Sequence, residues 1–404
     1  MNKKPKIMLS NFKNNWKIFS FYNLANVFQS GGTPSTKEPT FWGGTIPWIQ
    51  SSDIQKDILF GVIPQKFISE EGLLNSSAKL ISKNSIAIVT RVGVGKLAII
   101  DQDYATSQDF LSLSDFNGDT QFIVYSIYRM LQKESTQLQG TSIKGITKED
   151  LLSKKVSLPE IDEQSAIGSL FRTLDELLAS YKDNLANYQS LKATMLSKMF
   201  PKAGHTVPEI RLDGFEGEWE EKKLGEIVDI VGGGTPDTNV KEYWNGEINW
   251  FSPTEVGNSI YLDTSDKRIS ELGLQRSSAK ILPANRTILF TSRAGIGSVG
   301  IITKDSTTNQ GFQSLVTKQG IDIYFLFSYS SEITKYALKH AAGSTFLEIS
   351  GKELGKMDII IPTYDEQQAI GSYFSNLDNL INSHQEKISQ LETLKKKLLQ
   401  DMFI

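Results

Sequence analysis

One glycine-rich segment has the spacing of a loop that binds a dinucleotide or S-adenosylmethionine. Gly295-Ile-Gly297-Ser-Val-Gly300 fits the pattern G-x-G-x-x-G, which in such loops follows a strand, opens a helix and lets the backbone approach a pyrophosphate. Here the next residues, 301–305, are typical of a strand and a turn instead. The segment Gly93-Val-Gly95-Lys-Leu-Ala98 is a second copy that lacks the third glycine. We therefore interpret both segments as hairpin turns that need positive φ angles, and we predict no bound cofactor.

Other motifs that would carry chemistry at a bond are missing. Gly232-Gly-Gly234-Thr-Pro is not followed by the Gly-Lys-Ser/Thr of a phosphate loop. The sequence contains no G-x-S-x-G nucleophile elbow, and no Asn/Asp-Pro-Pro-Tyr/Phe segment of the kind with which DNA amino-methyltransferases hold a flipped base. The carboxylate pairs at 70–71 and 220–221 lie in charged surroundings, so we interpret them as solvated. We predict no catalytic residue.

A metal site is also not expected. The chain has no cysteine, which excludes disulfides and thiolate ligands. Its three histidines, His205, His340 and His384, are scattered along the sequence, and none forms a pair at metal-ligand spacing.

The composition is that of a globular protein with more than one domain. The chain has 404 residues, of which 39% are hydrophobic and 22% charged, and its net charge is −3; such a length suits roughly two to three domains. No apolar run approaches the ~20 residues that cross a bilayer, and the basic N-terminus lacks the apolar segment of a secretory signal. We therefore predict a cytoplasmic protein with no membrane partner. The acidic balance counts against a general nucleic-acid binder, although a local basic groove or a partner's positive charge would meet this objection.

The strongest signal is an internal repeat with an offset of 201 to 203 residues. Between residues 66–79 and 267–280, ten of fourteen positions are identical. Further matches, in the same order in both halves, are Gly31-Gly-Thr-Pro34 with Gly233-Gly-Thr-Pro236, Trp42 and Trp48 with Trp244 and Trp250, Arg91-x-Gly-x-Gly95 with Arg293-x-Gly-x-Gly297, Gln108-x-Phe110 with Gln310-x-Phe312, and Pro159-x-x-Asp-Glu-Gln164 with Pro362-x-x-Asp-Glu-Gln367. The chain is a tandem duplication, and two copies of one unit favour pseudo-two-fold packing.

Each copy has a globular part and a helical part. The globular part is rich in Gly, Ser, Thr and aromatic residues and contains short β-type runs such as 85–90, 287–291 and 358–361, so we predict a mixed α/β domain. Thr147 and Ser350 are each followed three residues later by an acid, the pattern of a capped short helix. We expect Asp162 and Asp365 to cap the helical parts. The predicted domains are 1–160 and 211–362, the predicted helices are 161–200 and 363–404, and 201–210 is the linker.

Each predicted long helix carries one apolar stripe over about 35 residues, which is typical of a coiled coil. A helix of this length spans on the order of 50–57 Å, longer than a small domain, so pairing of the two helices explains the stripes better than a core helix in each domain does. The residues predicted for the coiled coil or a partner interface are Leu174, Leu177, Tyr181, Leu185, Tyr188, Leu377, Leu380, His384, Ile388 and Leu391.

The duplicated motifs resemble those of the specificity (S) subunits of type I restriction–modification enzymes. The resemblance covers nearly the full length and includes the order of domains and helices. The matching segments are Trp219-Glu-Glu-Lys-Lys-Leu224-Gly-Glu-Ile227, Asn309-Gln-Gly-Phe312 and the Gly-Gly-Thr-Pro, Arg-x-Gly-x-Gly and Pro-x-x-Asp-Glu-Gln motifs. The resemblance implies the fold class α+β, with two pseudo-two-fold related mixed α/β target recognition domains separated by two long helices that form an antiparallel coiled coil.

The same resemblance implies a function. Each globular domain would read one half of a bipartite site in double-stranded DNA, and the coiled coil would fix the spacing of the halves and carry two methylation (M) subunits. Restriction (R) subunits would join the full complex. S-adenosylmethionine would bind the M subunit, and this chain would be non-catalytic.

The repeat separates two kinds of candidate DNA contact. Positions shared by both copies suit phosphate contacts and positions that differ suit base contacts, because phosphate contacts position a protein while base contacts specify the sequence. The shared cations are Lys66 with Lys267, Lys79 with Lys280 and Arg91 with Arg293. From them we take Lys79, Arg91, Lys280 and Arg293 as candidates for DNA contact, and anchoring of a hairpin is the alternative role for the arginines. The differing stretches are 54–65 with 256–266, 111–120 with 313–319, and 129–139 with 327–342; from them we take Gln55, Lys56, Asn117, Asn258, Tyr261 and Gln313 as candidates for base contacts. Drift in solvated loops is the alternative, and we interpret the shared tryptophans as core residues.

Two other functions stay open. One is a DNA methyltransferase, which binding of S-adenosylmethionine by this chain alone would favour. The other is a duplicated adaptor or ligand-binding module with no role on DNA, which fits the acidic net charge. DNA binding that stays unspecific in the presence of partners would favour the adaptor.

Overall fold

The computed structural model describes residues 4–12, 14–91, 93–137, 145–293, 295–343 and 347–404. The chain divides into two compact units: unit 1 is Met1–Lys182 with Glu386–Ile404, and unit 2 is Asp183–Gln385. Each unit therefore combines one globular domain with segments of both long helices, so the helices do not form a unit of their own. Of the predicted variable stretch 129–139, residues 138 and 139 lie outside the described residues.

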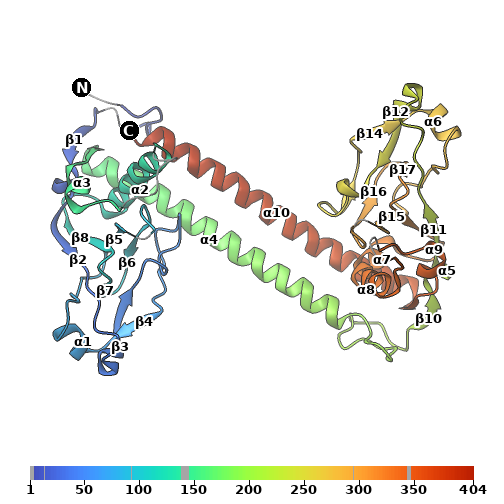
Figure 1. Ribbon diagram of the computed structural model, residues 1–404, viewed down its shortest axis with the longest axis horizontal. Coiled ribbons are helices and arrows are strands. Elements are labelled where there is room, and N and C mark those ends of the chain that lie inside the picture. Colours follow the sequence, from blue (N-terminus) through green and yellow to red (C-terminus); the bar gives the residue numbers. More distant parts are fainter. Residues whose placement is uncertain (1–3, 13, 92, 138–144, 294, 344–346) are drawn as a thin grey trace. The chain divides into compact units, whose positions relative to one another are not determined.

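The globular domain of unit 1 contains three sheets (Figure 1). Its strands are β1 (Lys17–Ser20), β2 (Ala25–Ser30), β3 (Trp42–Ile49), β4 (Lys66–Ile68), β5 (Ser85–Val89), β6 (Leu97–Ile100), β7 (Ala105–Thr106), β8 (Phe110–Phe116) and β9 (Lys155–Leu158). Its helices are η1 (Phe21–Leu24), η2 (Pro39–Phe41), α1 (Glu70–Leu74), α2 (Thr120–Gln137) and α3 (Lys148–Ser153). The strand orders among the described residues are β2-β8-β5-β6, β4-β3-β7 and β1-β9.

Unit 2 repeats this topology. Its strands are β10 (Glu220–Lys223), β11 (Val228–Gly232), β12 (Trp244–Phe251), β13 (Tyr261–Leu262), β14 (Lys267–Ile269), β15 (Thr287–Phe290), β16 (Val299–Ile302), β17 (Ser306–Thr308), β18 (Gln313–Thr317) and β19 (Asp358–Ile361). Its helices are α5 (Leu224–Ile227), η3 (Lys241–Tyr243), η4 (Pro253–Glu255), α6 (Glu271–Gln275), α7 (Ile323–Ser328), α8 (Ser330–His340) and α9 (Gly351–Leu354). The strand orders are β11-β18-β15-β16-β13, β14-β12-β17 and β10-β19. The structure thus confirms the duplication, with β13 added and α7 with α8 in place of α2.

The long helices are α4 (Ile161–Lys198) and α10 (Tyr364–Met402). They begin one residue before Asp162 and Asp365, which are therefore inside the helices, so the prediction of these two residues as N-caps is wrong. Both carboxylates lie in the first turn, where the helix dipole still favours a negative charge. The short helices agree with prediction, because the side chain of Thr147 accepts a hydrogen bond from the backbone of Asp150, as Ser350 does from Glu353.

Segments of α4 and α10 pair antiparallel within each unit. In unit 1 an ion pair joins Asp175 to Lys395, and farther along α4 a second one joins Lys182 to Glu392 at 2.7 Å. In unit 2 the ring of Tyr188 lies 5.2 Å from that of His384, and Lys192 pairs with Asp378. In both units residue numbers fall along α10 as they rise along α4. The antiparallel pairing implied by the family resemblance is therefore observed in each unit.

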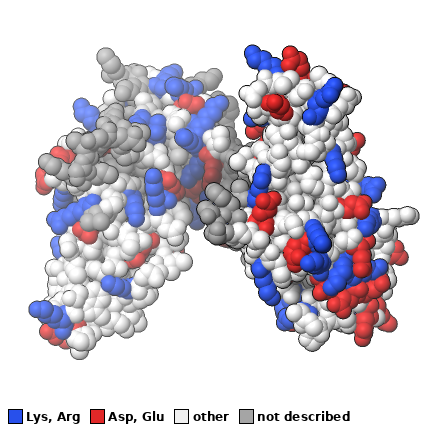
Figure 2. Space-filling model, turned by 45° about the vertical axis from the view of Figure 1, so that its right-hand side comes forward, with Lys and Arg blue, Asp and Glu red and all other residues white. Residues whose placement is uncertain are grey.

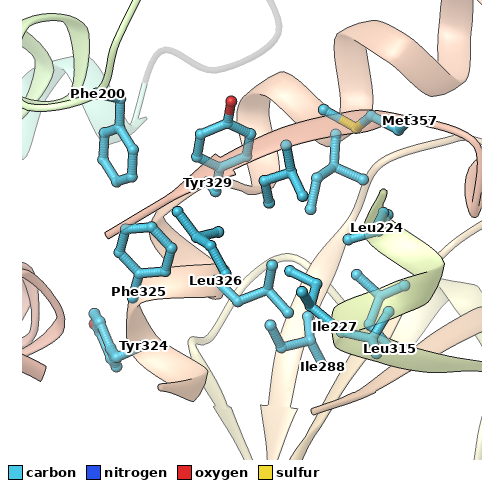
Figure 3. Close-up of a cluster of buried hydrophobic side chains, with 14 of the residues drawn as sticks. Phe200, Leu224, Ile227, Ile288, Leu315, Tyr324, Phe325, Leu326, Tyr329 and Met357 are labelled. Atoms are coloured by element: carbon cyan, nitrogen blue, oxygen red, sulfur yellow. The ribbon is translucent and has the colours of Figure 1, made fainter. Parts of the chain in front are cut away.

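The end of each long helix completes the aromatic core of the domain that belongs to the other repeat. In unit 2, Phe200 follows α4 and packs on Trp219, Phe325 and Phe374, with ring centroids 5.5–6.2 Å apart. Figure 3 shows Phe200 and Phe325 in this buried cluster. In unit 1, Phe403 follows α10 and packs in the same way on Trp16, Phe122 and Phe171, at 5.2–6.4 Å. Buried aromatic side chains contribute strongly to core stability, so each repeat depends on the other.

Candidate nucleic-acid interface

The two Arg-x-Gly-x-Gly segments are hairpin turns, as predicted. Strand β5 pairs antiparallel with β6, and β15 pairs antiparallel with β16. In the turns Gly95 has a φ of 94° and Gly297 a φ of 102°, values that favour glycine. Gly300 lies in β16 opposite Leu289, not at the start of a helix. The interpretation of this segment as a dinucleotide loop is thereby excluded.

The Gly-Gly-Thr-Pro turns and the shared tryptophans hold the frame of each domain. The Thr33 hydroxyl donates to Gln108 Oε1 at 2.5 Å, and the Trp48 indole donates to the carbonyl of Gly32 at 3.0 Å. The same contacts recur in unit 2, at 2.6 Å between Thr235 and Gln310 and at 2.8 Å between Trp250 and Gly234. The tryptophans are therefore core residues, as predicted, and they do not form an exposed stacking platform for bases.

The Pro-x-x-Asp-Glu-Gln motif attaches each long helix to its own domain. Gln164 Oε1 accepts a hydrogen bond from the backbone N–H of Asp119 at 3.1 Å, and its amide donates to the carbonyl of Pro159 at 2.9 Å. Gln367 makes the equivalent bonds to Asp322 and Pro362, at 3.1 and 3.0 Å. Gln164 thus attaches α4 to the start of α2, and Gln367 attaches α10 to the start of α7. This structural role is common to both copies.

The glutamate of this motif has a different partner in each unit. Glu163, almost fully buried, accepts a hydrogen bond from the Trp16 indole at 3.2 Å, and burial raises the pKa of its carboxyl. The equivalent Glu366, just as buried, receives two hydrogen bonds from the Arg211 guanidinium, at 2.7 and 2.8 Å. Sequence reasoning did not single out either carboxyl, because their burial depends on tertiary packing.

Lys79, Arg91, Lys280 and Arg293 are the four shared cations predicted to contact phosphates. Lys79, Arg91 and Lys280 are exposed and Arg293 is half-buried. None of the four side chains forms a hydrogen bond or an ion pair with another described residue. The predicted alternative, a bond that anchors the hairpin through the arginine side chain, is therefore not seen in this part of the chain. Figure 2 shows Lys and Arg interspersed with Asp and Glu on the faces in view, so a DNA contact would depend on local cations.

Two of the predicted base-contact residues, the exposed Asn117 and the half-buried Gln313, also have contacts within their own domain. The Asn117 amide donates to the carbonyl of Asn23 at 3.2 Å and exchanges hydrogen bonds with Asn26 at 3.1 and 3.3 Å. Gln313 lies in β18 opposite Gly232 and is half-buried. Strands β8 and β18 make up much of the stretches 111–120 and 313–319 and are mostly buried. Divergence between the copies therefore includes core positions as well as loops.

The other four predicted base-contact residues are exposed: Gln55, Lys56, Asn258 and Tyr261. Lys56 lines a groove of about 800 Å³ in unit 1, together with Arg172 of α4 and Lys395 of α10. Asn258 lines a hollow of about 360 Å³ in unit 2 that includes Gly297. The structure thus brings Asn258 together with the hairpin that carries Arg293.

The predicted coiled-coil residues divide into three groups by exposure. Leu174, Leu377, Ile388 and Leu391 are buried, while Tyr181, Leu185, Tyr188 and His384 are half-buried. Leu177 and Leu380 are 39% and 41% exposed, and their neighbours Leu178 and Ile381 are buried instead. Leu177 and Leu380 occupy equivalent positions of the repeat, so the same helix face is left uncovered in both copies.

Two kinds of site have no counterpart in the part of the chain that the structure describes. No helix there is both long and apolar enough to cross a membrane. No group of three or more His, Cys, Asp or Glu residues is placed to hold a metal ion.

Duplicated mixed α/β domains with paired long helices define the class of this protein. Residues 13–187 and 216–393 match the family model described as the type I restriction modification DNA specificity domain. The match covers most of the chain, so the chain belongs to this family.

Curated relatives match the chain over part of its length. The type I restriction enzyme MjaIX specificity subunit of Methanocaldococcus jannaschii is 36% identical over 192 residues, which are 46% of this chain and 44% of that protein. The type I restriction enzyme EcoR124I/EcoR124II specificity subunit of Escherichia coli is 33% identical over 190 residues, 45% of this chain and 46% of that protein. The chain spans less than half the length of either relative in these matches.

Solved structures share the fold over the full length. A crystal structure of a type I restriction–modification system S subunit from M. genitalium covers 100% of this chain and 99% of its own, with a TM-score of 0.66 at 17% identity. A structure from work on complex assembly and conformational transition of the type I R-M system covers 95% and 96%, with a TM-score of 0.52 at 19% identity. At such identities the likeness concerns the fold alone.

Proposed function

We propose that this chain is the DNA sequence-recognition subunit of a type I restriction–modification complex. The observation that carries the proposal is that both halves of the duplication match a DNA specificity domain, residues 13–187 and 216–393. Each globular domain reads one half of a bipartite site in double-stranded DNA. The chain itself is non-catalytic, acts in the cytoplasm, and leaves S-adenosylmethionine and methyl transfer to its M subunits.

The free cations of the two domains support binding to a phosphate backbone. Lys79 and Arg91 in unit 1, like Lys280 and Arg293 in unit 2, have no partner for their side chains among the described residues. Both arginines flank glycine turns at which a backbone can come close to a phosphate. Such contacts position the protein, and the exposed residues that differ between the copies, such as Gln55, Asn258 and Tyr261, contact bases.

The exposed leucines support docking of two copies of one partner. Leu177 and Leu394 are exposed in unit 1, as are Leu191 and Leu380 in unit 2, at 37–45%. In unit 1, two ion pairs join α4 to α10: Asp175 with Lys395 and Lys182 with Glu392. Leu177 and Leu394 lie between these charged residues in the sequence. The duplication presents the same apolar side chains twice, which fits two M subunits, with R subunits joining the assembled complex.

The test is to co-express the chain with the M subunit encoded beside it and to map modified adenines in the host genome by single-molecule sequencing. The expected result is one bipartite motif with two specific halves and a fixed gap. Exchange of the region before Pro201 for that of a relative should change one half of the motif and leave the other unchanged.

Other results would overturn the proposal. Assembly with the M subunit without any sequence motif would favour a structural adaptor. Methyl transfer or binding of S-adenosylmethionine by the purified chain alone would favour a methyltransferase.

A further inference from the structure

Each unit contains a triad of polar side chains, buried or half-buried, where α4 meets α10. In unit 1, Asp175 of α4 accepts a hydrogen bond from the Tyr125 hydroxyl at 2.6 Å through Oδ2 and pairs with Lys395 of α10 through Oδ1. Tyr125 is fully buried, and both charged side chains are largely buried. The Lys395 ammonium also lies 5.8 Å from the centre of the Tyr125 ring.

Unit 2 contains the same triad with the helices exchanged. Asp378 of α10 accepts from the Tyr324 hydroxyl at 2.8 Å through Oδ2, and it pairs with Lys192 of α4 at 2.5 Å through Oδ1. Asp175 and Asp378 are equivalent in the repeat, as are Lys192 and Lys395. Each triad therefore takes its aspartate from one repeat and its lysine from the other.

The tyrosine comes from a different sequence position in each triad. Asp119 and Asp322 are equivalent, since each accepts a hydrogen bond at 2.8 Å from the backbone three residues later. Tyr125 follows six residues after Asp119, whereas Tyr324 follows two after Asp322. Positions that differ by four residues lie on one face of a helix, so both hydroxyls reach the carboxylate from the same face. The two repeats keep this contact although the residue that supplies it has moved by one turn.

A buried ion pair is a strong determinant of register. Besides displacing the aromatic ends at Phe200 and Phe403, a slide by one turn would separate each aspartate from its lysine, which is costly for side chains that are largely removed from water. Polar residues inside coiled coils are best attested in this role of fixing register. The tyrosine extends the constraint to the globular domain, because α2 and α7 belong to the domains.

We propose that the two Tyr–Asp–Lys triads are positioning devices that set the register of α4 against α10 and thereby the number of base pairs between the two half-sites. This inference rests on the proposed function. The triad side chains bond to one another, so we assign them a positioning role rather than a contact with DNA. They act through the helix pairing that determines where each domain is held.

The experiment replaces both triads by apolar residues in the full chain, with its M subunit present. The variant carries Asp175→Leu, Lys395→Leu, Asp378→Leu and Lys192→Leu, with Tyr125→Phe and Tyr324→Phe so that no hydroxyl is left unpaired. Apolar replacement of a buried ion pair usually retains stability. We expect the bases of the two half-sites to stay the same. Methylation should also occur at sites whose gap is longer or shorter than the native gap by one or more base pairs. The preference for the native gap should fall by about tenfold or more, which corresponds to about 1.4 kcal/mol.

Two further variants separate positioning from support of the fold. The exchanged pair Asp175→Lys with Lys395→Asp keeps opposite charges in contact and should retain the native gap. The exposed ion pair of Lys182 with Glu392, at 2.7 Å on the same helices, is the matched control, and Lys182→Ala with Glu392→Ala should leave the gap unchanged. If the apolar variant methylates only at the native gap, the proposed role is refuted; if wild-type chain assembles but shows no bipartite motif, the proposed function fails instead.

A cross-linking measurement covers the case in which the apolar variant loses methylation. The chain has no cysteine, so single pairs can be introduced and joined by a short thiol-specific reagent. Two pairs are compared: Lys182→Cys with Glu392→Cys, and Lys182→Cys with Lys396→Cys, in which the cysteine of α10 is one turn away. With native triads we expect only the first pair to be cross-linked. With apolar triads both pairs should react. Reaction of the native pair alone in both backgrounds would overturn the proposal.

Discussion

At the residue scale, the two units differ in the partner of one buried glutamate. Glu163 and Glu366 occupy equivalent buried positions, but only Glu366 has a cation, Arg211, as its partner. A consequence is seen at the equivalent indoles, since Trp16 donates to Glu163 while the buried Trp219 Nε1 has no partner among the described residues. Neutralising Glu163 and neutralising Glu366 are therefore expected to have opposite effects on the free energy of unfolding.

We predict that Glu163→Gln stabilises the chain progressively as pH rises. Because burial raises the pKa of Glu163 above its usual 4.5, the folded chain binds this proton more tightly than the unfolded chain. The contribution of this carboxyl to the free energy of unfolding therefore falls as pH rises from about 4.5 through the raised pKa. The glutamine can still accept from Trp16. The difference in melting temperature between variant and wild type should grow in favour of the variant between acidic and neutral pH, and a constant difference would contradict the prediction.

We predict the reverse for Glu366→Gln. Removal of this carboxylate leaves the Arg211 guanidinium, whose side chain is 16% exposed, without its charged partner. Loss of one member of a buried ion pair costs about 3–5 kcal/mol, and partial exposure of Arg211 places the expected loss near the lower value. Thermal unfolding of the two matched variants in the same complex gives the comparison. Equal effects of the two substitutions would contradict the asymmetry.

At the element scale, the sequence predicts which helices pair but not which side chains meet. The stripe and the repeat are local patterns, so the pairing of α4 with α10 and the hairpin turns could be predicted. Leu177 and Leu380, predicted for the coiled coil or a partner interface, are exposed, and their neighbours Leu178 and Ile381 are buried instead. A stripe with spacings of three and four residues leaves the neighbouring position equally plausible for the helix seam. Lys192 and Lys395 occupy equivalent positions of the repeat, but they lie beside the predicted stripe, so the stripe did not reveal the triads.

We predict that Gly168→Ala and Gly371→Ala separate each long helix from its domain. A Cβ atom on Gly168 would lie 2.6 Å from Asp119 Oδ1 and 2.8 Å from the Phe122 nitrogen, and one on Gly371 would overlap Asp322 and approach Phe325. Overpacking costs about 1–3 kcal/mol, more than the ~1 kcal/mol that alanine contributes to helix propensity. Thermal unfolding should show a lower melting temperature for each variant. Ser169→Ala, on the exposed side of the same turn, is the control and should have no effect.

We predict that the exposed leucines determine how many M subunits are bound. Leu177→Ser with Leu394→Ser removes the exposed leucines of α4 and α10 in unit 1, and Leu191→Ser with Leu380→Ser removes those in unit 2. Each double variant should bind one M subunit, and the combined variant none, as measured by mass photometry of the purified complex. Leu74→Ser is the control, since Leu74 is 80% exposed on α1 and should not affect assembly. Retention of two M subunits by every variant would place the docking surface elsewhere.

At the scale of the whole molecule, duplication makes function easier to predict than the residues that perform it. Both copies share the tryptophans, the glycine turns and the glutamines Gln164 and Gln367, and the structure shows that these residues stabilise each domain. Base contacts must come from positions that differ, but differing positions also include the buried strands β8 and β18. Burial depends on packing between distant segments, so a comparison of the two copies alone could not separate loops from core.

We predict that the shared cations contribute affinity without sequence preference, and equally in both units. Lys79→Ala with Arg91→Ala, and separately Lys280→Ala with Arg293→Ala, should weaken DNA binding by the complex and lower the slope of log K against log salt by roughly 0.9 for each phosphate that is no longer neutralised. The recognised motif should stay the same. Lys155→Ala, an exposed lysine of β9, is the control. If one double variant changed the bases accepted in one half-site, its cations would contact base edges, and the division between shared phosphate contacts and differing base contacts would be wrong for that domain.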